Sequence, residues 1–575
     1  MGTIIFLLLL TAFLKPPSLF AESSFTTDQK IVYTLDNQNN ASVTHTITLQ
    51  NNLSLVFAKE YIITLPVPIN DTITGNDASG SIIKEIKKTD TATVIYLQFK
   101  NPSIGRNAQT NFQINYHLNK IVTTKGLTRE LELPTAPVSD TTEISIIAPT
   151  TFGQLSYSSL KPTQTISHVD TQQIDFKYTL QNSKKILVAF GNNQLFDFQL
   201  SYYLSNPTDK AVVKEIPIPP TTPSQKVTLK TINPSPNSIT QDGDGNWLAH
   251  YQLAPFANNT IQVDGQVKII SETGTTPLIG DYLKATTYWP TQNPQIQEIA
   301  QSLKTPKAIY DYVIATLTYD YSRLNNASRR HADEILANSS SALCTDFTDL
   351  FITIARAAGI PAREIEGYAY SNNTKIKPVN TQADILHAWP QYYDRPTSAW
   401  KSIDPTWGKT TNGIDFFSDL DLNHFAFVIH GQSDDYPPPP GSYKSAANEK
   451  SVTVTFAQSI YQPPVQPIKV TDKIFNPNLF SLTNCRLKNN QTGYIQNIDT
   501  LIPLASADIY LQNVPFPQVL LPSFATTKLT LTCDQLESPQ LINLTNKLHY
   551  LYLTLAIAAA ILILSGAGIM ITRHK

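Results

Sequence analysis

The chain has 575 residues, a formal net charge of −2 and only 15% charged residues. Its length is too great for a single hydrophobic core and predicts roughly four structural units, and its nearly balanced charge gives no indication of nucleic-acid binding. Asn, Thr, Ser, Gln and Pro take the place of the missing charged residues, as they do in many exported β-proteins.

An apolar run near the N-terminus indicates export. Residues 4–13 have the length of the apolar part of a secretory signal and are too short to cross a bilayer. Ala21 has the small side chain expected before a cleavage site, so we expect residues 1–21 to be a signal peptide. Because no Lys or Arg precedes the run, an uncleaved anchor is the alternative.

The region from residue 22 to residue 288 is rich in strand patterns. Polar and apolar residues alternate in stretches such as 43–49 and 196–202, which is the period of a half-buried strand. We therefore predict an N-terminal β-sandwich region over residues 22–192 and a second β-sandwich domain over residues 193–288. Weakly similar short segments suggest that the two sandwich domains and a C-terminal β-domain are related, although a shared β-strand composition would also produce such similarity.

Residues 289–431 show helix patterns followed by strand patterns. The predicted helices cover residues 294–304, 307–317 and 329–336, and a fourth begins at Cys344. The predicted strands cover residues 364–370, 387–393, 399–404 and 423–430. Helices followed by an antiparallel set of strands indicate an α+β domain.

The helix that begins at Cys344 carries one of only three cysteines in the chain. Its apolar residues recur at the spacing of one helix face, namely Phe347, Leu350, Phe351, Ile354 and Ala358. Gly359 and Pro361 end the helix. Cys344 therefore lies at the N-terminus of a buried helix, where free backbone N–H groups and the positive end of the dipole favour a thiolate.

A thiolate needs a base and an orienting carboxylate for acyl chemistry. His387 begins one predicted strand and Asp404 ends the next, so antiparallel pairing of the two strands would bring their side chains together at one sheet end. Asp384 is a weaker candidate for the orienting carboxylate. We expect His424 and His430 to lie on the last strand and outside the triad.

Several ordered motifs carry a family resemblance. They occupy residues 332–336, 344–351, 356–363, 367–368, 387–389 and 400–406. Together they resemble the core of the transglutaminase-like superfamily over about residues 290–431. The resemblance implies a papain-like fold in which Cys344 is the nucleophile, His387 its base and Asp404 the orienting group. It points to the mostly microbial branch, because Thr345 stands where the animal crosslinking enzymes have Trp.

Two departures from the family pattern affect what is expected. Pro390 and Gln391 stand where many members have a Val-Glu-like pair, and a proline within a strand predicts an edge or a bulge beside His387. No acidic loop like that of the calcium-dependent members is evident, and no spacing of Cys or His suggests a zinc site. We therefore expect neither a metal nor a cofactor.

The C-terminal third returns to strand patterns. We predict a Pro-rich linker over residues 432–449 and a C-terminal β-sandwich domain over residues 450–545. Cys485 and Cys533 both fall in this domain and are candidates for a disulfide in an oxidising compartment. Their pairing would leave Cys344 unpaired, as a nucleophile must be.

The last apolar segment predicts a membrane anchor. Residues 548–572 include a run without charged residues that is long enough to cross a bilayer. Arg573, His574 and Lys575 follow, and cationic residues mark the cytoplasmic side. We therefore expect a single-pass cell-membrane protein whose bulk is extracellular, with residues 573–575 as its cytoplasmic tail.

The sequence thus predicts a multidomain protein with an α+β papain-like core flanked by β-sandwich domains and followed by one transmembrane helix. The first functional hypothesis is a thiol enzyme that cleaves or transfers amide acyl groups of protein or peptide substrates at the cell surface, with hydrolysis favoured over crosslinking because no amine site can be read. The alternative is a catalytically inactive transglutaminase-like scaffold for adhesion or assembly.

Overall fold

The computed structural model of the protein describes residues 23–134, 136–137, 139–179, 186–271, 274–326, 328–379, 384, 386–411, 414–418, 420–446, 449–470, 473–510 and 526–545. The predicted signal peptide and the predicted transmembrane helix lie outside these residues. Among the helices that are described, none is long and apolar enough to cross a membrane. The chain divides into two compact units, the first comprising residues 1–122, 132–151 and 161–185 and the second the remainder.

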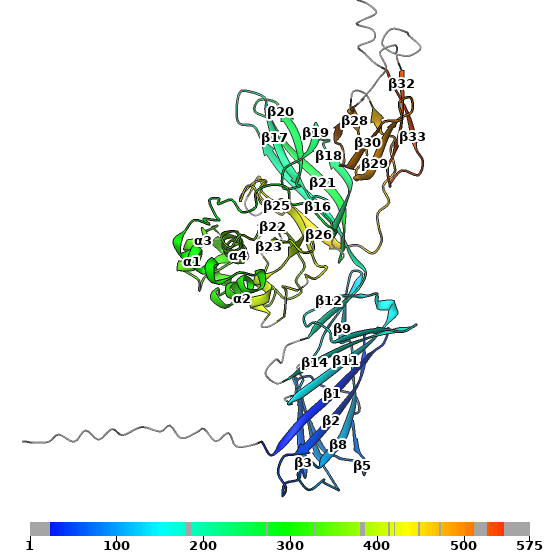
Figure 1. The fold of residues 1–575 in the computed structure, drawn as a ribbon, viewed down its shortest axis with the longest axis vertical. Coiled ribbons are helices and arrows are strands. Elements are labelled where there is room, and N and C mark those ends of the chain that lie inside the picture. The colour runs from blue at the N-terminus through cyan, green and yellow to red at the C-terminus, as the bar shows by residue number, and fades with distance from the viewer. Residues whose placement is uncertain are drawn as a thin grey trace, which may run out of the picture. The chain divides into compact units, whose positions relative to one another are not determined.

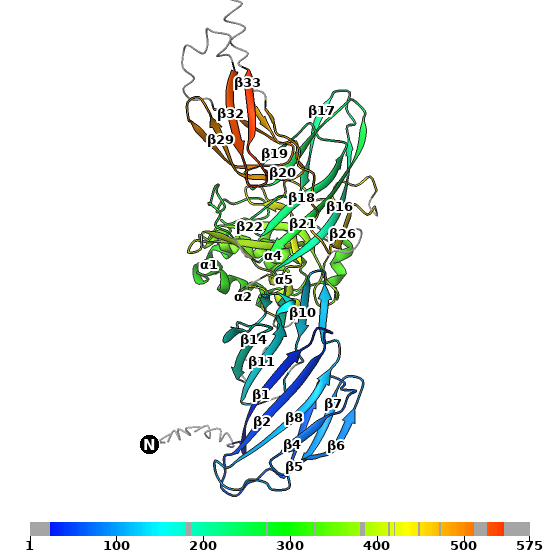
Figure 2. The ribbon, with the colours of Figure 1, turned by 90° about the vertical axis from the view of Figure 1, so that its right-hand side faces the viewer.

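The first unit is built of two β-sheets. The larger has the order β13-β14-β11-β1-β2-β8-β4-β5 and the smaller the order β3-β7-β6. The strands are β1 (Phe25–Leu35), β2 (Ala41–Asn51), β3 (Glu60–Leu65), β4 (Thr74–Asp77), β5 (Gly80–Ser81), β6 (Ile83–Lys88), β7 (Thr93–Gln98), β8 (Gln109–Leu118), β11 (Thr141–Pro149), β13 (Gln164–Ser167) and β14 (Thr171–Thr179). Figure 2 shows β6 and β7 beside the larger sheet.

Alternation of side chains explains why these two sheets pack together. In β2, Val43, Ile47 and Leu49 are buried, whereas Ser42 and Thr46 are exposed. Aromatic rings close the layer between the sheets, since the ring of Phe112 on β8 lies 5.4 Å from that of Tyr61 on β3. The period-two pattern of the sequence therefore reflects a sheet with one apolar face.

The second unit contains a β-sandwich that supports the candidate site. One sheet has the order β18-β21-β16-β26 and the other β17-β20-β19. The strands are β16 (Asn193–Ser205), β17 (Val212–Ile218), β18 (Gln225–Asn233), β19 (Ser238–Gln241), β20 (Trp247–Leu253), β21 (Asn258–Ile270) and β26 (Val452–Phe456). Buried side chains such as Leu200, Trp247 and Val263 fill its core.

Strand β26 differs from the sequence-based expectation. Residues 450–545 were expected to form one C-terminal domain, but β26 pairs antiparallel with β16, with Phe198 opposite Val454. The second sandwich is therefore completed by a strand from beyond the predicted linker. A strand pattern reveals a half-buried strand but carries no information about its partner.

Helices and one small sheet form the central part of this unit. The helices are α1 (Pro294–Ser302), α2 (Pro306–Thr316), the 3₁₀ helix η3 (Tyr321–Asn326), α3 (Ala332–Ala337), α4 (Cys344–Ala357) and α5 (Pro405–Thr410). The sheet has the order β24-β23-β22-β25, with β22 (Ala362–Ala369), β23 (His387–Asp394), β24 (Ala399–Ser402) and β25 (His424–His430). Figure 1 shows α1 to α4 gathered beside β22 and β23.

The buried helix predicted at Cys344 is α4. Phe347, Leu350, Phe351 and Ile354 are fully buried in a core shared with α1, α2 and α3. Gly359 follows the helix with φ of +81°, the left-handed conformation that glycine adopts at least cost. Core packing and the glycine turn therefore set the position of α4, and with it the position of its first residue, Cys344.

Strand β23 corrects the expectation drawn from Pro390. It pairs with β22 on one side and with β24 on the other, so it is not an edge strand. Its pairing with β24 runs only from Gln391 to Asp394. Pro390 thus lies just beyond the last of these pairs, which is where a residue without an N–H group is tolerated.

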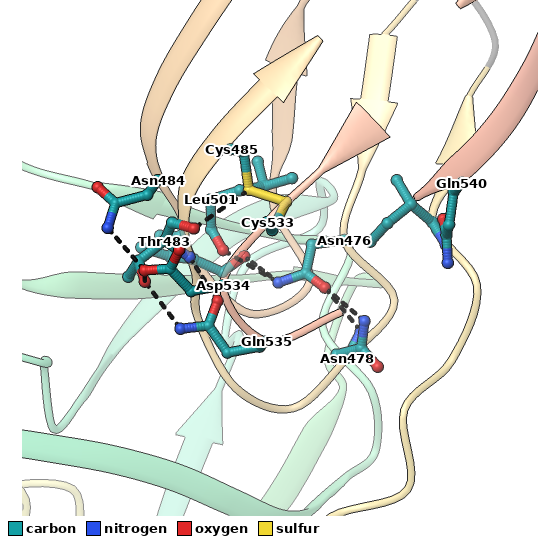
Figure 3. The surroundings of a disulfide bond; sticks show 12 residues. Asn476, Asn478, Thr483, Asn484, Cys485, Leu501, Cys533, Asp534, Gln535 and Gln540 are labelled. Atoms are coloured by element: carbon teal, nitrogen blue, oxygen red, sulfur yellow. Dashed lines mark hydrogen bonds between the residues drawn. A yellow bond between two sulfur atoms is a disulfide. The ribbon is translucent and has the colours of Figure 1, made fainter. Parts of the chain in front are cut away.

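Four further strands and a small C-terminal β-region complete the second unit. The former are β9 (Val122–Lys125), β10 (Thr128–Glu132), β12 (Leu155–Ser158) and β15 (Leu187–Phe190), in the order β12-β15-β10-β9. The latter comprises β27 (Lys469–Val470), β28 (Lys473–Phe475), β29 (Leu482–Asn489), β30 (Ile495–Leu501), β31 (Ser506–Asp508), β32 (Thr526–Thr532) and β33 (Gln540–Thr545). Cys485 and Cys533 form a disulfide there, and Figure 3 shows it beside Thr483 and Asp534.

Candidate active site

Cys344 is the first residue of α4 and a free, partly exposed thiol. Asp346 in the same turn accepts a hydrogen bond from the N–H of Leu343 at 2.6 Å. Its negative charge, which would oppose a thiolate, is offset by Arg323 at 2.5 Å and Arg330 at 3.0 Å. The helix N-terminus is therefore held in place without leaving an uncompensated negative charge beside the sulfur.

His387 and Asp404 come together at one end of the sheet. Nε2 of His387 lies 3.0 Å from Oδ2 of Asp404, and both side chains are buried. The other carboxylate oxygen of Asp404 accepts a hydrogen bond from the N–H of Trp407 at 3.0 Å, which makes Asp404 the N-cap of α5. Trp407 also stacks on the imidazole, with 5.2 Å between the ring centroids.

The electrostatics of this pair favour a charged imidazole. Burial lowers the pKa of His387, but Asp404 and then Cys344 outweigh it and raise that pKa to about 9. Burial raises the pKa of Asp404, but the charge of His387 outweighs it and lowers that pKa to about 2. Near neutral pH the histidine is therefore an imidazolium that is bound to a carboxylate.

The remaining ring nitrogen of His387 is not bound to a carboxylate. Nδ1 of His387 is buried and makes no hydrogen bond among the described residues, whereas Cys344 is close enough to help raise the pKa of the imidazole. The structure thus brings all three predicted residues together. Nε2 of His387 is bound to the carboxylate, which leaves Nδ1 as the ring nitrogen available to exchange a proton with the thiol.

Tyr319 is a further polar group close to the sulfur, and no motif in the sequence marks it. Its ring is buried, and its hydroxyl has no hydrogen-bond partner among the described residues. Burial first and the negative charge of Cys344 second raise the pKa of Tyr319 well above its usual value. The hydroxyl therefore stays protonated and is an available donor close to Cys344.

The alternative candidates occupy other places. Asp384 accepts hydrogen bonds from the backbone of Ser451 and Val452 and pairs with Lys444 at 2.6 Å, so it orients the chain before β26 and not the imidazole. His430 lies on β25, as expected, and its Nδ1 is 3.0 Å from Glu364.

His424 lies on the last strand, as expected, but it also reaches the triad carboxylate. It begins β25, but its Nε2 lies 3.7 Å from Oδ2 of Asp404, and its Nδ1 lies 2.7 Å from Oδ1 of Asp421. A register shift in the pairing of β22 with β25, between Glu366 and Gly367, sets which face His424 occupies. No feature of the sequence reveals that shift.

Two groups of side chains in the described part of the chain have the close ligand atoms that a metal ion requires. They are His387, Asp404 and His424, and Glu364, Glu366 and His430. In both groups a cation is already supplied by the protein. An imidazolium is bound in the first, and Arg329 lies 2.8 Å from Glu364 in the second.

A comparison with known proteins places these residues in a family context. Residues 291–405 match the family model described as the transglutaminase-like superfamily. A protein-glutamine gamma-glutamyltransferase of Pseudomonas aeruginosa is 26% identical over 127 residues, which is 20% of this chain and 18% of the relative. An uncharacterized protein of Bacillus subtilis, YebA, is 30% identical over 114 residues, which is 18% of this chain and 15% of the relative.

Among solved structures, the periplasmic domain of TgpA from Pseudomonas aeruginosa has 15% sequence identity and a TM-score of 0.23, and the match covers 39% of this chain and 92% of that one. The chain matches less than a fifth of the length of the two curated relatives.

Proposed function

We propose, from the premise that residues 291–405 are a transglutaminase-like domain, that this protein is a thiol enzyme acting on amide groups of protein or peptide substrates. The observation that carries the proposal is the buried contact between His387 and Asp404, with Cys344 close enough to raise the pKa of the same imidazole. A thiol, an imidazole and a carboxylate in this order perform nucleophilic acyl transfer on unrelated folds.

The first half of the reaction forms a thioester. The Cys344 thiolate attacks the amide carbonyl carbon, and the carbonyl π electrons move to oxygen to give a tetrahedral oxyanion. As the carbon–nitrogen bond breaks, the leaving nitrogen takes the Nδ1 proton of His387 and departs as an amine or ammonia. Asp404 holds the ring in the orientation that this transfer requires.

The oxyanion needs donors fixed in advance. The backbone N–H of Cys344 has no acceptor within the helix, because it belongs to the first turn of α4. The unpartnered hydroxyl of Tyr319 is a second donor near the sulfur. We assign these two groups to the developing negative charge.

The second half of the reaction resolves the thioester. Water or a primary amine attacks the carbonyl carbon, His387 accepts the proton of the nucleophile, and the Cys344 thiolate leaves. Water gives a carboxylic acid, whereas a lysine-type amine gives an isopeptide bond. We favour hydrolysis over crosslinking, because no binding site for an amine can be read from the sequence.

Two measurements test this proposal. Cys344 is the one free cysteine beside the disulfide, so iodoacetamide should label only this residue, and faster than an ordinary thiol near neutral pH. His387→Ala should slow this labelling. Incubation with a glutamine peptide and a labelled amine should release ammonia, with or without incorporation of the amine, and Cys344→Ala should abolish both.

Ordinary reactivity of Cys344 that His387→Ala leaves unchanged, together with no turnover of the peptide, would instead support an inactive scaffold.

We further propose that the enzyme acts outside the cell from a membrane anchor. The apolar segments at residues 4–13 and 548–572 and the disulfide between Cys485 and Cys533 support this location. A thiol reagent that cannot cross membranes should label Cys344 in intact cells. Labelling that requires cell lysis would contradict this location.

A further inference from the structure

A second imidazole lies on the far side of the triad carboxylate. His424 is held between two acidic side chains, with its Nδ1 2.7 Å from Asp421 and its Nε2 3.7 Å from Asp404. All three side chains are almost completely buried. No sequence pattern assigns His424 a role, and the proposed reaction does not use it.

The surroundings of His424 hold it in this orientation. The ring of Trp407 lies 4.4 Å away, centroid to centroid, and that of Trp389 lies 5.1 Å away. Asp421 accepts a hydrogen bond from the N–H of Asn423 at 3.1 Å. The imidazole thus packs between two tilted indole rings, which restrict its rotation away from the two carboxylates.

The charges around His424 favour its protonated form. The titratable groups facing it are Asp421, Asp404 and His387, and Lys377 lies behind Asp421 at 3.5 Å. Burial lowers the pKa of His424, but Asp421 and then Asp404 outweigh it and raise that pKa. One buried carboxylate, Asp404, is therefore shared by two cationic rings whose centroids are 5.8 Å apart.

Sharing has a direct consequence for His387. A cation beside Asp404 offsets part of the negative charge that stabilises the His387 imidazolium, and it also repels that imidazolium directly. Both effects weaken the hold on the His387 proton. A base that held its proton too firmly would be slow to give it to the leaving amine.

We propose that His424 is a positioning residue that, kept charged by Asp421, limits how firmly Asp404 holds the proton of His387. The catalytic benefit of this coupling rests on the proposed function. The coupling between the charges of His424, Asp404 and His387 exists whether or not the protein turns over a substrate. It adds two positioning residues, His424 and Asp421, behind the triad of Cys344, His387 and Asp404.

The rate of Cys344 alkylation by iodoacetamide, measured on the full chain from pH 5 to 11, tests the coupling without a substrate. Loss of the His387 proton frees a more nucleophilic thiolate, so the wild-type rate should rise in a step near pH 9. His424→Gln removes the second cation and should move this step upward by about one pH unit.

A matched control lies on the same strand. His430 is equally buried and is also held by a carboxylate, but that carboxylate is Glu364 and not Asp404. His430→Gln should leave the step near its wild-type pH. If His424→Gln does not fold, Asp421→Asn answers the same question, because a neutral His424 should move the step upward by a smaller amount.

The outcomes separate this inference from the proposed function. A step that stays in place in the soluble His424 or Asp421 variant, or that moves equally in His430→Gln, overturns the coupling. A step that moves while the wild-type chain neither hydrolyses nor transfers the glutamine amide leaves the coupling standing and rejects the enzyme. A purely structural role for His424 would lower the yield or stability without moving the step.

Discussion

Replacing Arg329 with methionine should strongly destabilise the central domain. The guanidinium lies 2.6 Å from Asp349 on α4 and 2.8 Å from Glu364 on β22, and both carboxylates are fully buried. The substitution leaves Asp349 with the indole N–H of Trp289 and Glu364 with His430. Removing one partner of a buried ion pair costs about 3–5 kcal/mol. Asp349 loses its cation here, whereas Glu364 keeps the charged His430.

Arg323 provides a matched control. Its side chain has the same 16% exposure as that of Arg329, and it also binds a buried carboxylate, Asp346. Asp346 keeps a second cation, Arg330 at 3.0 Å, when Arg323 is removed. Arg323→Met should therefore cost no more than about 1 kcal/mol, the value of an interaction whose loss leaves no group unpaired.

Tryptophan fluorescence during urea unfolding measures the difference, because four of the five tryptophans lie between residues 289 and 407. With a slope of about 1–3 kcal/mol per molar urea, Arg329→Met should lower the midpoint by at least about 1 M. Equal midpoints for the two variants would refute the assignment of this cation to two buried carboxylates.

The same variant has a predicted pH dependence. Burial raises the pKa of Asp349 to about 7, and Arg329 opposes that rise, so the pKa of Asp349 rises further without the cation. In the folded variant Asp349 then holds a proton that the unfolded chain has released above about pH 4, and stability falls as pH rises through this window. The deficit should be larger at pH 8 than at pH 5, and a deficit that grows toward acid would contradict the argument.

Three further changes have defined outcomes. Tyr319→Phe should lower turnover by about 10²–10³-fold through loss of an oxyanion donor but leave the rate of iodoacetamide labelling of Cys344 nearly unchanged. An equal decrease in turnover and in labelling rate would assign Tyr319 to thiolate formation instead. Gly367→Ala should destabilise the central sheet by more than about 2 kcal/mol, because a Cβ there would lie 2.2 Å from the carbonyl oxygen of Phe425; an unchanged urea midpoint would contradict this close approach. Replacing Cys485 and Cys533 with alanine opens a 48-residue loop and should lower the stability of the C-terminal β-region by about 4 kcal/mol. Proteolysis should then cleave this region earlier, while labelling of Cys344 stays unchanged. Unchanged proteolysis would show that packing alone stabilises this region.

The sequence was most informative where chemistry is tied to a local feature. The start of α4 could be predicted because Cys344 precedes a helical stripe that Gly359 ends. His387 and Asp404 could be paired because each lies at the end of a strand pattern, and adjacent antiparallel strands bring such ends together.

Long-range arrangements account for what was not predicted. His424 reaches Asp404 only through the register shift between β22 and β25. Arg329 precedes α3 and joins Asp349 to Glu364 from outside both of their elements. Nor could the strand pattern at residues 452–456 show that β26 would join the second sandwich. Each of these depends on which surfaces meet, and periodicity in one segment does not report its partner.

The two oxygens of Asp404 bear on how an inactive descendant of this protein would look. One oxygen caps α5 and the other orients the imidazole, so a lineage that lost its chemistry would still need a side chain that accepts the cap hydrogen bond. Aspartate could survive there for folding alone, whereas nothing in the packing of a partly exposed thiol demands sulfur at position 344. To distinguish catalytically active relatives from inactive ones, the presence of cysteine at position 344 is therefore informative, whereas the presence of aspartate at position 404 is not.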